Sequence, residues 1–268
     1  MPASLDSIVA ATRQRVSLTR RNCDLHALEQ AAARHTPRGF RNRLRSVAQD
    51  GIAVIAELKK ASPSKGLIRA DFRPAELAKE LEQAGAAALS VLTDELHFQG
   101  SLDFLCQASA ATSLPCLRKD FIIDDVQILE ARANHADAIL LIVAALEDRE
   151  LKSLGAAARK QGLDVLCEAH DELELQRALD AGFDLIGINS RNLRTFEVDH
   201  GTQFRLVEKM PTTCVRVAES GIHSGEALAR LRSAGYDAFL IGESLMKTEK
   251  PGEVLARFME EATFVDDR

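Results

Sequence analysis

Aromatic side chains are scarce in this chain of 268 residues, which has no Trp, one Tyr and 11 Phe. Since 46% of the residues are nonetheless hydrophobic, the core is expected to be built from aliphatic side chains. No apolar run approaches the ~18 residues that a membrane-spanning helix needs, so no membrane contact is predicted. The net charge of −6 argues against a general nucleic-acid binder.

The chain also lacks any cluster of metal ligands or paired cysteines. Its five cysteines are scattered, and no C-x-x-C or Cys/His cluster occurs. This pattern predicts free thiols in a reducing compartment, hence a cytoplasmic protein without a metal site. Cys116, Cys167 and Cys214 lie in apolar runs and are expected in the core. Most of the seven histidines lie outside the predicted strand ends and are expected to be solvent-exposed.

The N-terminal region is locally basic, with nine arginines in the first 45 residues. A transit peptide or a nucleic-acid patch would be basic in the same way. However, Leu5, Ile8, Val9, Thr12 and Val16 recur at helical spacing. This periodicity favours an amphipathic helix that packs on the main domain and turns a basic face to solvent.

Short apolar segments alternate with amphipathic helical segments from residue 53 onward, which indicates a parallel sheet. The turns A-G-A-A (84–87), A-G-F-D (181–184) and A-G-Y-D (234–237) each precede a strand, and Gly suits the end of the preceding helix. Eight strands favour a (β/α)8 TIM barrel over an open doubly wound sheet, and no G-x-G-x-x-G follows the first strand. The expected strands are Ala53–Leu58, Ala87–Leu92, Pro115–Arg118, Ala138–Val143, Asp164–Cys167, Leu185–Ile188, Cys214–Ala218 and Ala238–Ile241.

A single domain is expected, because no linker rich in Pro, Gly or Ser divides the chain. Residues 1–50 are assigned to an N-terminal helical extension and residues 51–268 to the barrel core. A chain of this length is within the range of single α/β barrels.

Polar residues follow most of the predicted strands, at the end where barrel enzymes hold their active sites. Glu57 and Lys59 are two residues apart in a strand and therefore share a face. A Lys in a crowded cationic site can have a lowered pKa and act as a general acid, with a nearby Glu as base. The polar residues at strand ends are Glu57, Lys59, Lys119, Asp120, Glu168, Asn189, Arg191, Glu219, Ser220, Gly221, Gly242, Glu243 and Ser244.

Two further features suggest what this end of the barrel binds. The short turns S-G-I (220–222) and G-E-S (242–244) follow the last two strands, where their backbone N–H groups can meet an anion such as phosphate. Lys59 could add a charge-assisted contact to the anion. Phe98 and Phe121 lie beside strand ends, either as rim packing or as an apolar wall for a flat aromatic substrate.

Several long motifs together resemble the indole-3-glycerol-phosphate synthases of tryptophan biosynthesis. They run through the whole predicted barrel, and the N-terminal helix resembles the extension of that family. The motifs are I-A-E-L-K-K-A-S-P-S-K-G (55–66), V-L-T-D-E (91–95), F-Q-G-S (98–101), L-R-K-D-F-I-I-D (117–124), A-D-A-I-L-L-I-V-A-A-L (136–146), N-S-R-N-L-R-T-F-E-V-D (189–199), A-E-S-G-I (218–222) and L-I-G-E-S-L-M (240–246).

The resemblance implies ring closure of 1-(2-carboxyphenylamino)-1-deoxyribulose 5-phosphate with loss of carbon dioxide and water, and implies no cofactor. Lys119 matches the acid that protonates the ketone oxygen, and Glu168 matches the base that assists dehydration. Which lysine gives which proton stays open, since Lys59 could be the acid of the dehydration step. Glu57, Lys59 and Glu219 match residues that orient these groups. Substrate contacts are implied for Ser62, Phe98, Phe121, Asn189, Arg191, Ser220 and Leu240, and phosphate contacts for Lys59, Gly221, Gly242, Glu243 and Ser244.

The chain departs from the family pattern at Leu96 and His97, at Asp125-Val126 and at Ser190, none of which is a predicted acid or base. Residues 59–73 are expected to form a mobile lid. A monomer is expected, with possible contact to other tryptophan-pathway enzymes. The alternatives are another phosphate-binding barrel, such as a sugar-phosphate isomerase, and a barrel kept as a non-catalytic scaffold.

Overall fold

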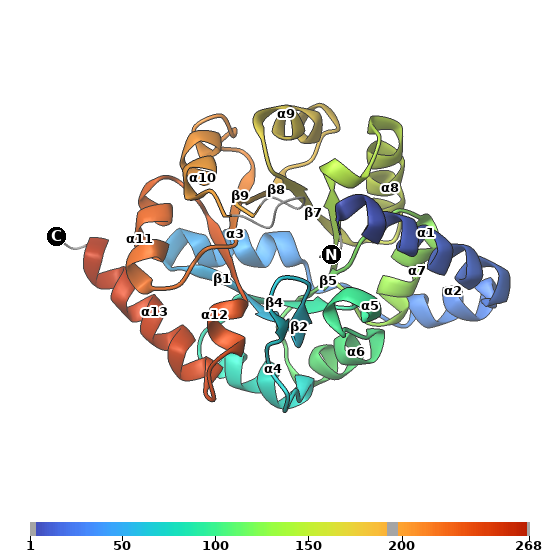
Figure 1. The fold of residues 1–268 in the computed structure, drawn as a ribbon, viewed down its shortest axis with the longest axis horizontal. Helices are drawn as coiled ribbons and strands as arrows, with labels where there is room; N and C mark the ends of the chain where they lie inside the picture. The colour runs from blue at the N-terminus through green and yellow to red at the C-terminus, as the bar shows by residue number, and fades with distance from the viewer. Residues whose placement is uncertain (1–3, 192–197, 267–268) are drawn as a thin grey trace.

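Eight parallel strands close into a barrel at the centre of the molecule, as Figure 1 shows. The computed structural model describes residues 4–191 and 198–266. Around the barrel the strands follow the order β1-β10-β9-β8-β7-β6-β5-β4, so each is paired with its neighbour in the chain. The barrel strands are β1 (Ala53–Leu58), β4 (Ala88–Leu92), β5 (Cys116–Lys119), β6 (Ala138–Ile142), β7 (Asp164–Ala169), β8 (Leu185–Asn189), β9 (Val215–Glu219) and β10 (Ala238–Ile241).

Helices occupy the connections between strands and form the outer layer (Figure 1). Several begin at a side chain that accepts a hydrogen bond from an N–H of the first turn, as at Ser101, Asp171 and Ser224. The helices after β1 are α4 (Pro74–Gln83), α5 (Glu95–Phe98), α6 (Leu102–Ala111), α7 (Asp125–Ala133), η1 (Val143–Ala145), α8 (Asp148–Lys160), α9 (Glu172–Asp180), α10 (His200–Val207), α11 (Gly225–Ser233), α12 (Glu243–Met246) and α13 (Pro251–Asp266).

The predicted (β/α)8 barrel is therefore confirmed, with strand ends displaced by at most two residues. Gly85, Gly182 and Gly235 all have positive φ at the ends of helices, as predicted from the repeated Ala-Gly turns. The sequence did not predict the small hairpin after β1, which is formed by β2 (Ala61–Ser62) and β3 (Gly66–Leu67).

Residues of each strand alternate between two apolar layers. In β1, Ala53 and Ile55 belong to a cluster that draws side chains from all eight strands and fills the barrel. Val54 and Ala56 belong to the second cluster, which lies between the sheet and the helices. Because successive side chains of a strand point to opposite faces, the next inward-facing residue after Ile55 is Glu57, which lies at the mouth of the barrel.

The N-terminal extension is helical, as predicted, and packs on the barrel. Leu5 and Ile8 of its first helix are buried against the inner cluster. Arg15 of the same helix pairs with Asp120, which directly follows β5, with 3.1 Å between Nη2 and Oδ1. The helices of the extension are α1 (Leu5–Asn22), α2 (Leu25–Ala33) and α3 (Phe40–Asp50).

The cysteines and the helices also bear on the predictions made from composition. Cys116, Cys167 and Cys214 are buried free thiols, as expected. Within residues 4–191 and 198–266, none of the helices combines the length and the apolar character that crossing a bilayer requires.

Asp137 anchors the extension to the other end of the barrel, just before β6. Its side chain is fully buried and accepts hydrogen bonds from the backbone N of Arg38 at 2.7 Å and of Cys116 at 2.6 Å. The guanidinium of Arg38 also donates to Asp137, at 2.7 Å from Nη2 and 3.0 Å from Nε. This carboxylate thus accepts hydrogen bonds from both the N-terminal extension and β5.

Replacing Asp137 by Ala should lower the free energy of unfolding by about 3 kcal/mol, because buried donors lose their acceptor and Arg38 loses its counter-charge. Chemical denaturation measures this change. The matched control is Asp71→Ala, since the pair of Asp71 with Arg73 is exposed on both sides and its loss should change the free energy of unfolding far less. A similar small loss in both variants would contradict the anchoring role.

Candidate active site at the mouth of the barrel

The charged side chains at the mouth continue the inward-facing positions of the strands. Lys119 follows Leu117 on β5, Glu168 follows Leu166 on β7, and Glu219 follows Val217 on β9, each two residues further along. The apolar residue of each pair lies in the inner cluster. A layer of charge therefore lies directly on the aliphatic core.

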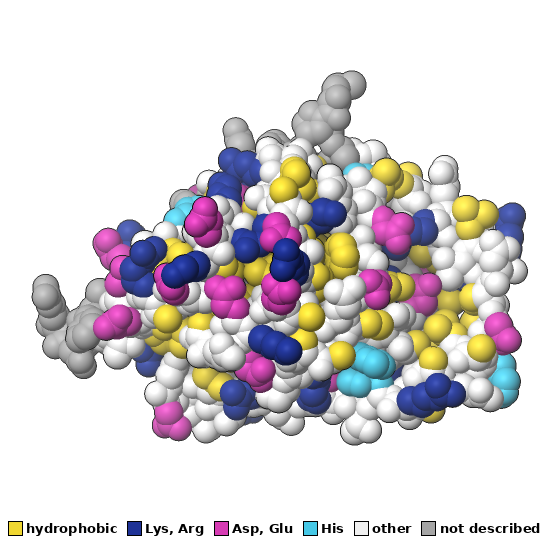
Figure 2. All heavy atoms as spheres, turned by 90° about the horizontal axis from the view of Figure 1, so that it is seen from below, with side chains coloured by type: hydrophobic (Ala, Val, Ile, Leu, Met, Phe, Trp, Pro, Cys, Tyr) yellow, Lys and Arg dark blue, Asp and Glu magenta, His cyan; other side chains and the backbone are white. Residues whose placement is uncertain are grey.

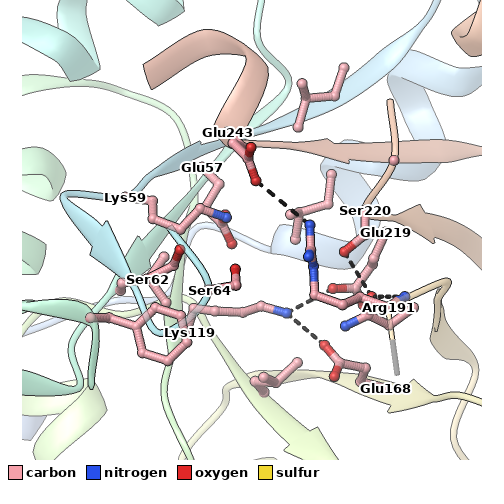
Figure 3. Close-up of a pocket in the computed structure, with 18 of the residues that line it drawn as sticks. Glu57, Lys59, Ser62, Ser64, Lys119, Glu168, Arg191, Glu219, Ser220 and Glu243 are labelled. Carbon is pink, nitrogen blue, oxygen red and sulfur yellow. Dashed lines mark hydrogen bonds and ion pairs between the residues drawn. The ribbon is translucent and has the colours of Figure 1, made fainter. Parts of the chain in front are cut away.

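Lys119 is the centre of this layer. Its Nζ donates to Oε2 of Glu168 and to Oε2 of Glu219, both at 2.7 Å, as the dashed lines in Figure 3 show. The side chain of Lys119 is 11% exposed, and those of Glu168 and Glu219 are 2% and 1% exposed. The three groups thus form a compact, nearly dry ion cluster.

The protonation states follow from this arrangement. Burial lowers the pKa of Lys119, but the carboxylates of Glu168, Glu219 and Glu57 outweigh it and raise the pKa above its ordinary value. Burial likewise opposes ionisation of Glu168, but Lys119 and His170 hold its pKa well below the usual range. Burial, with the charge of Glu168, raises the pKa of Glu219. The cluster therefore holds a charged lysine and an ionised Glu168.

The expectation of a crowded cationic site with a lysine of lowered pKa was wrong. Three carboxylates face Lys119, so the shift has the opposite sign. The sequence shows which residues follow the strands, but it does not show which charges meet across the barrel.

Glu57, near the end of β1, and Lys59, just beyond it, form the predicted acid–base pair, as an ion pair between Oε2 and Nζ. Space for this pair comes from Gly242, which directly follows the neighbouring strand β10. A Cβ atom at Gly242 would lie 2.3 Å from Oε2 of Glu57. Gly242, predicted as a phosphate contact, also makes room for a charged side chain of the cluster.

Gly187 makes room for Glu219 in the same way. It was not predicted from the sequence as a site residue. A Cβ atom at position 187 would lie 2.0 Å from Oε1 of Glu219. Gly187 pairs with Glu168 on one side and with Val217 on the other. A glycine on the inner face of a strand was the available signal, since it marks a close approach of another group.

The turns after β9 and β10 lie side by side, as the phosphate prediction requires. Ser220 and Gly221 have φ values of 67° and 76°, which places successive residues in the left-handed region. The hydroxyl of Ser244 donates to the carbonyl of Ile222 at 2.7 Å and so joins the two turns. Gly242 precedes the short helix α12, whose first N–H groups have no partner within the helix.

Asn189 and Arg191, beyond β8, reach the same mouth. Oδ1 of Asn189 accepts from the hydroxyl of Ser220 at 2.8 Å and from the backbone N of Arg191 at 3.0 Å. The guanidinium of Arg191 pairs with Glu243 at 3.6 Å across the pocket (Figure 3). Lys247 also pairs with Glu243. Burial raises the pKa of Glu243, but Lys247, together with the charges of Lys65 and Lys59, outweighs burial and lowers the pKa.

An apolar wall closes the opposite part of the pocket. The rings of Phe98 and Phe121 lie with centroids 6.4 Å apart, and both line the pocket together with Leu140 and Leu240. Ser62, from the hairpin after β1, also lines the pocket, and within the part of the chain that the structure describes its buried hydroxyl has no hydrogen-bond partner. The pocket therefore combines a flat apolar surface with a polar, charged floor.

The structure brings all the predicted site residues to this one pocket. It also corrects the expectation that most histidines are solvent-exposed, because His35, His97, His135 and His170 are partly buried. His170 lies next to Glu168, within the site itself. Within the described part of the chain, His, Cys, Asp and Glu side chains form no group that could hold a metal ion.

Comparison with known proteins agrees with this geometry. The family model described as "Indole-3-glycerol phosphate synthase" matches residues 5–258. The chain is 59% identical to the indole-3-glycerol phosphate synthase of Koribacter versatilis, over 95% of this chain and 98% of that protein. It is 49% identical to that of Leptothrix cholodnii, over 94% and 97%. The chain belongs to the indole-3-glycerol phosphate synthase family.

Solved structures at low sequence identity share the fold alone. The tryptophan synthase alpha chain from Legionella pneumophila has a TM-score of 0.63 at 12% identity and covers 87% of this chain and 100% of its own. The thiamine phosphate pyrophosphorylase from Pyrococcus furiosus has a TM-score of 0.62 at 15% identity, over 84% and 98%. Within the indole-3-glycerol phosphate synthase motif at 189–199, residues 192–197 lie outside the described residues.

Gly187→Ala should lower turnover at least about 10-fold, because the added methyl group displaces Glu219 from Lys119, and should destabilise the fold by about 1–3 kcal/mol. Steady-state kinetics and chemical denaturation measure the two effects. In the control Gly51→Ala, the nearest atom to the new Cβ is 3.5 Å away, so both values should stay near wild type. Wild-type turnover in Gly187→Ala would show that Glu219 does not need this space.

Proposed function

We propose that Lys119 and Glu168 are the general acid and general base of the indole-3-glycerol phosphate synthase reaction that this chain carries out. The observation that carries this assignment is the pair of 2.7 Å contacts from Nζ of Lys119 to Glu168 and Glu219 on the pocket floor. A proton donor and an acceptor are thus held in contact below the space for the substrate.

In the first step, the ring carbon bearing the carboxylate attacks the ketone carbon, and the ketone oxygen becomes an alkoxide. Lys119 donates a proton to this oxygen. A raised pKa is compatible with this role, because the alkoxide that forms is a stronger base than the lysine amine. Loss of carbon dioxide then restores the aromatic ring.

The second step removes water, and Glu168 takes the proton that must leave with the hydroxyl group. Its low pKa keeps it ionised and therefore ready to accept a proton. The acid for this step is either Lys119 again or Lys59, which Glu57 holds at the same mouth. Both alternatives use only side chains of the described pocket.

The pocket also suggests how the substrate is oriented. We place its phosphate at the backbone N–H groups of Gly221, Gly242, Glu243 and Ser244, with Lys59 adding a positive charge. The carboxyphenyl ring would lie against the apolar wall. The contacts proposed for the ring, its carboxylate and the sugar hydroxyls come from Ser62, Phe98, Phe121, Asn189, Arg191, Ser220 and Leu240.

The pairing of Glu243 matters for this placement. Its carboxylate would repel a phosphate at the N-terminus of α12, but Arg191 and Lys247 pair with it. The backbone N–H groups can then serve the anion while the side chain stays neutralised by cations.

The remaining predictions concern the protein as a whole. We propose a single domain spanning 1–268, a cytoplasmic monomer and possible contact with other tryptophan-pathway enzymes. On the face drawn in Figure 2, Lys and Arg side chains alternate with Asp and Glu, which supports the prediction that nucleic acid is not a partner. A sugar-phosphate isomerase or a scaffold would not need the buried cluster around Lys119.

Lys119→Met and Glu168→Gln should each lower kcat at least about 100-fold, with a smaller change in substrate binding, because each removes a group that moves a proton. Indole fluorescence during conversion of the carboxyphenylamino-deoxyribulose phosphate measures turnover. Lys79→Met is the control, since Lys79 is exposed on α4, and it should keep wild-type activity. A Lys119→Met or Glu168→Gln variant with wild-type kcat would remove that residue from the mechanism.

A further inference from the structure

His170 links the active-site cluster to the helix behind it. It directly follows β7 (Asp164–Ala169), and its side chain is 13% exposed. On one side, its Nε2 lies 3.3 Å from Oε1 of Glu168. On the other side, its Nδ1 lies 2.9 Å from Oε2 of Glu174, in the first turn of α9. The imidazole thus lies between two carboxylates.

Glu174 fixes His170 in two ways. The same Oε2 atom that meets Nδ1 also accepts the backbone N–H of His170, at 2.8 Å. Both the ring and its backbone are therefore tied to one carboxylate on a helix, and rotation of the ring would break this arrangement. A residue that orients a histidine from behind in this way is common where the histidine must keep one nitrogen aimed at a functional group.

Glu168 is consequently held from both sides. Its Oε2 receives Nζ of Lys119 at 2.7 Å, while its Oε1 faces Nε2 of His170. The ion pair with His170 has the longer distance and is not a well-aligned hydrogen bond, since Nε2 has no hydrogen-bond partner among the described residues. His170 therefore meets Glu168 as a nearby cation on the side away from Lys119.

We propose that His170, anchored by Glu174, is a positioning residue that keeps Glu168 ionised and aimed at the substrate throughout the reaction. This inference rests on the proposed role of Glu168 as the general base. Lys119 cannot provide this support throughout the reaction, because in the proposed first step it gives up a proton and its charge, and it must regain both before it can act again. His170 remains as the cation beside Glu168 at the moment when Glu168 must still be a carboxylate.

The charge of His170 agrees with this geometry. Burial lowers the pKa of its imidazole, but Glu168 and Glu174 outweigh that effect and raise the pKa to about 10. His170 is therefore protonated at neutral pH. The charged groups that face it are Glu168 from β7 and Glu174 from α9, and Lys119 lies on the far side of Glu168.

Two substitutions test the role. His170→Ala removes the cation, and His170→Gln keeps a polar side chain of similar reach but no charge. Both should lower kcat about 10- to 100-fold with KM changed by less than about 3-fold, because substrate contacts stay in place while the base is misaligned. In both variants the acidic limb of the pH profile of kcat should move to higher pH, because Glu168 loses a cation and its pKa rises.

A double variant separates this role from a general loss of structure. In the Glu168→Gln background, adding His170→Gln should change kcat by less than about 2-fold, because a residue that acts only through Glu168 has nothing left to support. Glu174→Gln should reproduce part of the kcat loss. The control is Glu172→Gln, since Glu172 lies on the same helix but pairs with Lys209 at the surface, and it should keep wild-type kinetics.

The results separate the proposed role of Glu168 as base from the proposed role of His170 in positioning it. If Glu168→Gln keeps wild-type turnover, the proposed base is wrong and His170 has no base to position. If Glu168→Gln is inactive but His170→Gln has a normal kcat and an unmoved acidic limb, only the role of His170 is overturned. Equal losses from His170→Gln in the wild-type and Glu168→Gln backgrounds would likewise overturn it, because they would show an effect independent of Glu168.

Discussion

A charged lysine held between buried carboxylates is the interaction on which the rest of the site depends. Lys119 meets Glu168 and Glu219 at 2.7 Å in a setting almost closed to water. Removing a charged group from water is costly unless a partner of opposite sign is held at hydrogen-bond distance. The barrel meets this cost by fixing each partner on a different strand, so that the groups stay together without mobile loops.

The barrel interior explains why charge can be held there at all. Below the cluster, aliphatic side chains from all eight strands fill the space and give the charged layer a rigid base. Two glycines, Gly187 and Gly242, provide the room that Glu219 and Glu57 need. Arg15 pairs with the buried Asp120, the residue after Lys119, and so ties the N-terminal helix to the strand that carries Lys119.

Much of this architecture could be predicted from the sequence, because the period of two along each strand places Glu57, Lys119, Glu168 and Glu219 on the inner face. The family motifs supplied their expected roles. Contacts between strands far apart in the chain could not be predicted in this way. The sign of the Lys119 pKa shift depends on three carboxylates from other strands, and the space at Gly187 depends on the register between β8 and β9. His170 was not predicted as a site residue, because its partner Glu174 lies on the next helix.

The central claim is that Lys119 acts in ring closure and Glu168 in the later loss of water. The most direct test is a single-turnover experiment with enzyme in excess, in which released carbon dioxide and indole fluorescence are followed together. Glu168→Gln should release carbon dioxide within about 10-fold of the wild-type rate while indole appears at least about 100-fold more slowly, and Lys119→Met should slow both signals. Equal slowing of both signals in Glu168→Gln would contradict this division of roles.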